Sequence, residues 1–265
     1  MAIKFCSLSS GSSGNCQYIE TKETKILIDA GFSGKRVEEL LDEIDVNPKD
    51  LDAILVTHEH MDHSKGVGIL SRRHNIPVYA NAKTWESMER IIKAIKTENT
   101  KVFQTNKNMH IKDVLIHPFN LSHDALEPVG YIIFSDMKKL SFITDTGWVN
   151  EGIKNKIKNS NLYFMESNHD IKMLMEGSYP WYLKKRILSP HGHLSNDDAG
   201  SILGELLRGE NEIVLLAHLS KDNNRPELAY KTVRDALLCQ GFDVDNDVRL
   251  CMTNRDKKTQ VFILE

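Results

Sequence analysis

Four potential metal ligands follow one short apolar run in this sequence. Residues 54–57 read Ile-Leu-Val-Thr, and His58, His60, Asp62 and His63 come directly after them. Side chains two residues apart in an extended segment project to the same side, so His58 and His60 can hold one ion. Asp62 and His63, beyond a turn, would then reach a second ion. A solitary histidine is usually an ordinary polar residue, but this cluster after a buried strand predicts a metal centre.

Three more residues stand in the same position relative to an apolar run. His123 follows the segment 119–122, Asp145 ends the run 140–144 and His218 ends the run 213–217. Three imidazoles and one carboxylate do not complete two coordination spheres, so we expect these residues to supply further ligands. Imidazole and carboxylate donors suit Zn, Mn or Fe, and the sequence therefore predicts two divalent ions of this kind.

The elements that must position these residues alternate along the chain. Apolar runs predict strands at residues 3–8, 25–29, 53–57, 114–118, 131–135, 140–144, 162–166 and 213–217. Helical periodicity predicts helices at residues 34–44, 64–74, 84–95, 197–207 and 226–240. Successive strands without a helix in 108–144 indicate mixed sheets rather than one parallel sheet. We find no repeat or linker and expect a single domain over residues 1–265.

The composition is that of a globular protein, and it gives no indication of a membrane partner. Hydrophobic residues make up 40% and charged residues 27% of the 265 residues. The absence of an apolar run of roughly 20 residues, or of a secretory pattern, predicts a cytoplasmic protein. The four cysteines show no CxxC spacing, so we expect free thiols.

Charge does not by itself indicate a partner. The net charge of −3 argues against an extended surface for polyanions. Two short basic clusters could still form a local basic path, although each also reads as an ordinary solvated helix face: Lys154, Lys156 and Lys158, and Lys184, Lys185 and Arg186.

A loop rich in serine and glycine is a candidate substrate site. Its amides and hydroxyls could form an anion-binding nest, with Ser10, Ser12, Ser13 and Asn15 as the contacts. A tight hairpin explains the same composition equally well. The loop is not a P-loop, because it lacks the lysine of that motif.

Other polar residues at strand ends have two interpretations each. His169 could line a substrate cleft, although Asn168 or Asp170 beside it might equally cap a helix. His193 is a candidate for contacting a phosphate or protonating a leaving group, and the nearby His191 reads as a loop histidine. Asp29 begins what reads as a simple Asp-Ala-Gly turn.

The motifs THEHMDH, SHDA, TDTG and LAHLS, in this order, resemble those of the metallo-β-lactamase-fold hydrolases. The resemblance implies an α/β fold, an αββα sandwich of two mixed sheets flanked by helices. It assigns His58, His60 and His123 to one metal. It assigns Asp62, His63 and His218 to the other, with Asp145 bridging the two. For Asp29 it implies a second interpretation beside the simple turn, in which this carboxylate holds a ligand histidine. The segments SLSSGSSGNC and ESNHD also resemble the YycJ/WalJ branch of nuclease-like proteins.

These features predict a dinuclear metal-dependent phosphodiesterase acting on nucleic acid, in which a hydroxide shared by the metals attacks phosphorus. Asp62 would orient that hydroxide or accept its proton. The resemblance adds the expectation of a 5′-to-3′ exonuclease with DNA as the partner, and leaves a homo-oligomer open. The alternatives are a hydrolase of a small thioester, lactone or cyclic phosphodiester, and a binding module with purely structural metals.

Overall fold

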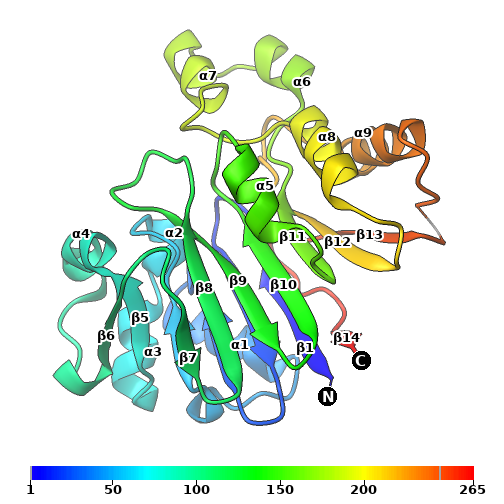
Figure 1. The fold of residues 1–265 in the computed structure, drawn as a ribbon. Coiled ribbons are helices and arrows are strands. Elements are labelled where there is room, and N and C mark those ends of the chain that lie inside the picture. The colour runs from blue at the N-terminus through cyan, green and yellow to red at the C-terminus, as the bar shows by residue number, and fades with distance from the viewer. Residues whose placement is uncertain (1, 245) are drawn as a thin grey trace. The chain divides into compact units, whose positions relative to one another are not determined.

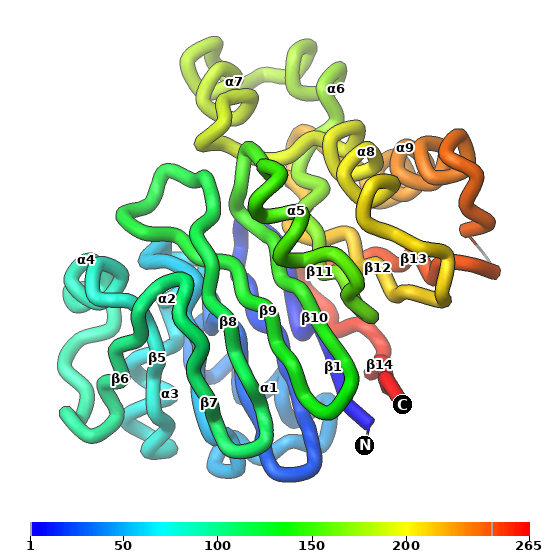
Figure 2. The backbone as a smooth tube through the Cα atoms, viewed as in Figure 1, coloured from blue at the N-terminus to red at the C-terminus, as the bar shows by residue number. Residues whose placement is uncertain are grey.

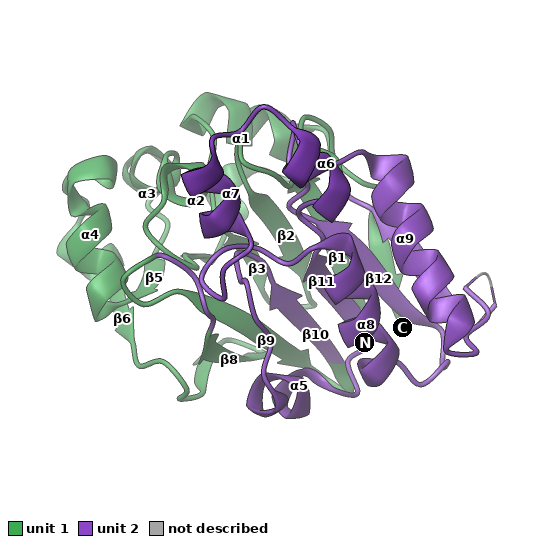
Figure 3. Ribbon diagram, turned by 90° about the horizontal axis from the view of Figure 1, so that it is seen from above, with its two compact units in different colours: residues 1–120, 125–138, 254–265 green, residues 121–124, 139–253 purple. Residues whose placement is uncertain are grey.

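The computed structural model describes residues 2–244 and 246–265 (Figure 1). Its strands form two seven-stranded sheets, both mixed, with flanking helices, as the sequence predicts. The strand orders are β14-β1-β2-β3-β4-β5-β6 and β13-β12-β11-β10-β9-β8-β7. The chain divides into two compact units, coloured separately in Figure 3. Unit 1 comprises residues 1–120, 125–138 and 254–265, and unit 2 comprises residues 121–124 and 139–253.

The first sheet lies within unit 1. Its strands are β1 (Ile3–Ser9), β2 (Cys16–Glu20), β3 (Lys25–Ile28), β4 (Ala53–Leu55), β5 (Val78–Asn81), β6 (Thr100–Phe103) and β14 (Phe262–Leu264). Neighbours from β14 to β3 are antiparallel, and those from β3 to β6 are parallel. The carboxyl ends of β3 and β4 therefore meet at one edge, which is where Asp29 and the histidine cluster begin.

Helices cover this sheet and close the core of unit 1. They are α1 (Gly34–Asp42), α2 (Met61–Ser64), α3 (Val67–His74) and α4 (Ala82–Ile92), with short 3-10 turns η1 (Pro48–Asp50) and η2 (Thr97–Asn99). Ser33 caps α1 and Asn81 caps α4 through side-chain bonds to backbone N–H groups. Leu27, Ile54, Leu40 and Leu70 lie in their shared core, all fully buried.

Two hairpins complete unit 1. Strands β7 (Met109–Ile111), β8 (Val114–Asn120) and β9 (Val129–Ser135) pair in antiparallel order. The Tyr131 hydroxyl donates to the Val56 carbonyl at 2.6 Å, and Val129 N donates to Thr57 O at 3.1 Å. These bonds fasten β9 to the segment that leads from β4 into the histidine cluster.

Unit 2 contains a parallel array. It runs through β10 (Lys138–Ile143), α5 (Glu151–Ile157), β11 (Leu162–Glu166), α6 (Ile171–Glu176), α7 (Trp181–Ile187), α8 (Asn196–Leu206), β12 (Glu212–Ala217), α9 (Pro226–Cys239) and β13 (Val248–Met252). Neighbours from β10 to β13 are parallel. Figure 2 follows this path through green to orange. Parallel strands bring their carboxyl ends to one edge, so Asp145, Glu166 and His218 emerge together.

The sequence located part of these elements: the strands β2, β5, β6, β7, β13 and β14 were not among those predicted, and one predicted helix needs correction. All eight predicted strands are present, and four of the five predicted helices differ only by a few residues at their ends. The predicted helix 64–74 is wrong at its start, because two helices, α2 and α3, replace it. The break lies at Gly66, whose added Cβ would stand 2.4 Å from the Phe32 carbonyl oxygen. No helix in the described residues is both long and apolar enough to cross a membrane.

Replacing Tyr131 with Phe should lower the free energy of unfolding by about 1–3 kcal/mol. The ring keeps its packing, but the buried Val56 carbonyl loses its partner. Tyr182→Phe is the matched control, because the Tyr182 side chain is exposed. Urea unfolding followed by circular dichroism measures both variants, and equal midpoints would show that the Tyr131 bond does not stabilise unit 1.

Candidate metal centre

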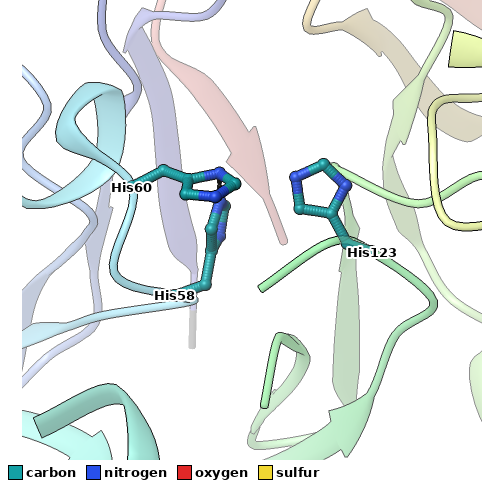
Figure 4. Close-up of side chains that lie close together, drawn as sticks. All are labelled: His58, His60 and His123. Atoms are coloured by element: carbon teal, nitrogen blue, oxygen red, sulfur yellow. Dashed lines mark hydrogen bonds between the residues drawn. The ribbon is translucent and has the colours of Figure 1, made fainter. Parts of the chain in front are cut away.

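In unit 1, the chain turns sharply after β4 and brings three imidazoles together. His58 Nε2 lies 3.0 Å from His60 Nδ1, and the His58 and His63 ring centroids are 4.1 Å apart. Two imidazole ligands of one tetrahedral ion at about 2.0–2.1 Å stand roughly 3.3 Å from each other. The spacing of these nitrogens therefore fits a shared ion. Figure 4 draws His58 and His60 of unit 1 together with His123 of unit 2.

Asp62 and His63 lie in the single turn of α2, and Asn15 contacts both of them. Asn15 N donates to Asp62 O at 2.7 Å, and the Asn15 amide lies 3.1 Å from His63 Nε2. Gly31 packs against the same peptide, since a Cβ there would lie 1.7 Å from Asp62 O. Only glycine permits this close approach. The contact fixes the position of the backbone from which the Asp62 and His63 side chains project.

Asp29 anchors the histidine of this turn. Its carboxylate accepts bonds from His63 Nδ1 at 2.7 Å and from Thr57 N and Oγ1 at 2.8 Å each. Burial raises the pKa of Asp29, and the neighbouring His63 opposes that rise. Asp29 also has φ +62°, so both interpretations of this residue hold: it forms the turn and it holds the histidine. With Nδ1 bound, His63 presents Nε2 as its remaining ligand atom.

A second group of donors gathers in unit 2. One ligand atom from each of four residues lies within 4.8 Å of the other three: Asp145, Glu166, His193 and His218. His218 Nδ1 is 3.4 Å from Asp145 Oδ1, and His123 Nε2 is 3.8 Å from the same oxygen. Asp145, His123 and His218 are all buried. The three residues that the sequence predicted as ligands in this unit therefore lie together.

Glu166 is the residue that the ligand prediction missed. It is fully buried at the end of β11, and its Oε1 accepts bonds from His193 Nδ1 at 2.7 Å and His218 Nδ1 at 2.8 Å. Oε2 accepts Thr146 N at 2.8 Å. Burial would raise its pKa, but the charges and hydrogen bonds of His193 and His218 lower the pKa to about 2. Glu166 thus does for His218 what Asp29 does for His63. In the sequence, the available indication of this role was an acidic residue at the end of an otherwise apolar strand.

The serine-glycine loop is organised around Asn15. The Asn15 side chain accepts from Gly11 N at 3.0 Å and contacts Ser10 Oγ at 3.4 Å, and Gly14 N donates to Gly11 O. Several groups of the expected nest are thus engaged within the loop. Ser10 and Asn15 are buried, whereas Ser12 and Ser13 are exposed. Substrate contact by these residues stays a prediction.

The remaining histidines of unit 2 differ in their surroundings. His169 is buried beside Ser195, and neither ring nitrogen has a hydrogen-bond partner among the described residues. Burial lowers its pKa to about 4. Asp170 caps α6 by accepting Met173 N at 2.7 Å, as one alternative predicted. His191 is exposed and contacts Ser122 Oγ at 3.2 Å.

The fold is shared with known proteins. The model of the beta-lactamase superfamily domain matches residues 24–219. The chain belongs to this superfamily, in its metallo-β-lactamase branch.

Two relatives are similar over nearly their whole length. One is the exodeoxyribonuclease YycJ of Bacillus anthracis, 43% identical over 98% of this chain and 99% of the relative. The exodeoxyribonuclease WalJ of Streptococcus pneumoniae is 41% identical over 98% and 97%. The metallo-beta-lactamase fold protein YhfI of Bacillus subtilis, a solved structure, has a TM-score of 0.74 at 17% identity over the full length of both chains, which confirms the fold.

Because burial favours the neutral form of His169, the stability of the folded protein should depend on pH in the acid range. The unfolded chain protonates this side chain near its ordinary pKa of 6.5, whereas the folded chain does so only near 4. In metal-free protein the free energy of unfolding should therefore fall as pH drops from about 6.5 to 4, by on the order of 3 kcal/mol from this residue.

Urea unfolding at several pH values tests this by comparing His169→Gln with the parent. The variant should show a shallower loss of stability in that pH range, whatever its stability at neutral pH. His110→Gln is the control, since His110 is exposed. Parallel pH curves for parent and His169→Gln would contradict the assignment.

Proposed function

We propose that this protein is a metal-dependent exodeoxyribonuclease that removes nucleotides from a 5′ end. The observation that carries the proposal is the buried set of imidazoles and carboxylates in a chain 43% identical, end to end, to a protein named exodeoxyribonuclease. Hydrogen-bonded carboxylates behind His63 and His218 support catalysis, because such partners raise ligand basicity and fix ring orientation.

Two divalent ions are the proposed cofactors. Their ligands are the seven residues that the sequence predicted, namely His58, His60, Asp62, His63, His123, Asp145 and His218. Bound divalent ions would supply Lewis-acid activation of water and would stabilise charge developing on a phosphate. Seven protein ligands for two ions leave positions for water and substrate, whereas structural zinc sites close with four protein ligands.

Asp62 and His193 are the proposed acid–base residues. The Asp62 side chain is 24% exposed, against 4% for Asp145, so Asp62 is the accessible carboxylate that can orient a water molecule and accept its proton. Burial would lower the pKa of His193, but the charge and hydrogen bond of Glu166 outweigh burial and raise it. A histidine whose pKa is raised in this way holds its proton more strongly and can contact a phosphate oxygen or give a proton to the leaving oxygen.

Asp145→Ala should abolish cleavage of DNA, because it removes the buried carboxylate whose oxygen lies close to both His123 and His218. The assay uses single-stranded DNA with a 5′ phosphate, labelled in parallel at the 5′ or 3′ end, with Mn or Zn supplied in turn. Cys239→Ala, at an exposed position on α9, is the control. Progressive shortening from the 5′ end by parent and control alone is the expected result.

The opposite result is equally clear. If the parent leaves DNA and RNA intact with every metal but hydrolyses a thioester, lactone or cyclic phosphodiester, the nuclease proposal is wrong. The same donors would then serve a small-molecule hydrolase.

Glu166→Gln should reduce metal affinity and cleavage rate by about 10- to 100-fold, because the charge that orients His218 and His193 is lost. Glu212→Gln is the matched control, since Glu212 is also buried and accepts two backbone N–H bonds, from Arg208 and Glu210. Metal titration and steady-state kinetics measure both variants. Equal losses in the two variants would indicate a general effect of removing a buried charge.

A further inference from the structure

The two helices that follow β11 have an unusual distribution of side chains. Figures 1 and 2 show α6 and α7 in yellow-green, standing away from the strands of unit 2. On α7, Trp181 is 55% exposed and Tyr182 is 76% exposed, whereas Lys184 between them and the helix end is buried. Large aromatic side chains in water and a lysine inside reverse the usual preference.

The buried lysine fixes this orientation. Lys184 Nζ donates to the carbonyl oxygens of Met175 and Gly177 at 2.7 Å each, which fastens α7 to the end of α6. Turning α7 to bury Trp181 and Tyr182 would pull this ammonium away from its two acceptors. The exposure of the two aromatic rings is therefore built into the packing of the segment, and it calls for a partner.

Positive charge accompanies the exposed rings. Lys185 Nζ lies 5.5 Å from the Trp181 ring centroid, and Lys185 and Arg186 are both exposed. The seven residues of α7 contain three basic and no acidic side chains, in a chain whose net charge is −3. Lysine and arginine beside aromatic faces are what single-stranded nucleic acid binds, since phosphates meet the cations and bases stack on the rings.

This surface leads directly into the donors of unit 2. The loop after α7 places Gly192 O at 3.2 Å from His123 Nδ1 and His193 Nδ1 at 2.7 Å from Glu166. Arg186 pairs with Asp124, the residue after His123. Gly147, two residues after Asp145, packs so closely on this loop that an added Cβ would lie 2.2 Å from Ser189 O. The next residue, Trp148, is 56% exposed.

We propose that Trp181, Tyr182 and Lys185, here called the aromatic platform, bind the bases and backbone of a single DNA strand next to the reacting end. This inference rests on the proposed nuclease function and names the form of its substrate. Within a duplex the base faces are covered by their stacked neighbours and only the terminal pair exposes one, so the platform favours a single strand. A second copy of the chain is a poorer occupant, because two-fold pairing would set Lys185 and Arg186 near their own counterparts.

The test is binding of a fluorescent single strand that resists cleavage. Metal-loaded protein is titrated into a phosphorothioate-linked twelve-residue strand and into a duplex of the same sequence, and fluorescence anisotropy gives Kd. The parent should prefer the single strand. Trp181→Ala with Tyr182→Ala should raise Kd for the single strand by about 10- to 100-fold, and Trp181→Phe alone should retain most of the affinity.

Controls separate this surface from the catalytic machinery. Met137→Ala removes another exposed apolar side chain, 88% exposed and in unit 1, and should leave Kd unchanged. Hydrolysis of bis(p-nitrophenyl) phosphate, which has no strand to stack, should be equal in the parent and in the platform variants. Loss of that hydrolysis together with strand binding would indicate damage to unit 2 and would overturn the platform.

The two proposals fail separately. If the parent cleaves DNA and the platform variants bind and cleave it equally well, the platform is wrong and the nuclease stands. If the parent binds single strands through the platform but does not cleave DNA whichever metal is supplied, the nuclease proposal is wrong and the platform stands. If the variants lose only self-association by sedimentation, the surface serves a second copy and the platform is wrong.

Discussion

The buried hydrogen bond between a carboxylate and the Nδ1 of a histidine is the interaction on which the rest of this structure depends. Unit 1 contains it as Asp29 to His63 and unit 2 as Glu166 to His218, at 2.7 and 2.8 Å. Each carboxylate ends a buried strand and also accepts a backbone N–H group. An isolated buried carboxylate would be costly, and these contacts offset that cost while fixing the rings. Each half of the donor set is thus assembled within its own unit.

Backbone geometry at the strand ends is the accompanying constraint. Asp29, Asp145 and His218 have φ values of +62°, +58° and +55°, which is an uncommon region for residues with a side chain. Strand pairing and buried amides hold them there: Asp29 N donates to Leu55 O, and the Asn168 amide donates to His218 O at 2.8 Å. The abrupt change of direction sends each side chain off the end of its sheet, away from the alternation of the strand.

How far sequence reasoning reached depends on whether the information was local. Apolar runs ending in His or Asp were visible one strand at a time, so eight of the strands, the mixed sheets and the gathering of donors within each unit could be predicted. Glu166 could not be chosen among the acidic residues, because its role arises from two histidines far along the chain. The break at Gly66 was equally hidden, since there the backbone N–H of Gly66 donates to Ala30 O at 2.7 Å, and Ala30 lies far back in the sequence.

The exposed aromatic rings of α7 illustrate the same limit. The sequence suggested that the three basic residues of α7 lie on an ordinary solvated helix face, and only the buried contacts of Lys184 show which side faces outward. The serine-glycine loop shows the reverse case: its composition suggested ligand binding, while its Asn15 turned out to brace Asp62 and His63.

The segment that carries α6 and α7 begins and ends at nearly the same place. Asn168 N donates to Leu194 O and Asn196 N donates to His169 O, both at 2.9 Å, so the backbone closes on itself at its base. The part of this excursion that carries α6 and α7 can be lengthened, shortened or exchanged with little effect on β11 or α8. Evolution can therefore rework the two helices while Gly192 and His193 stay at the base of the excursion, and an engineer can graft a foreign recognition segment in place of residues 171–187.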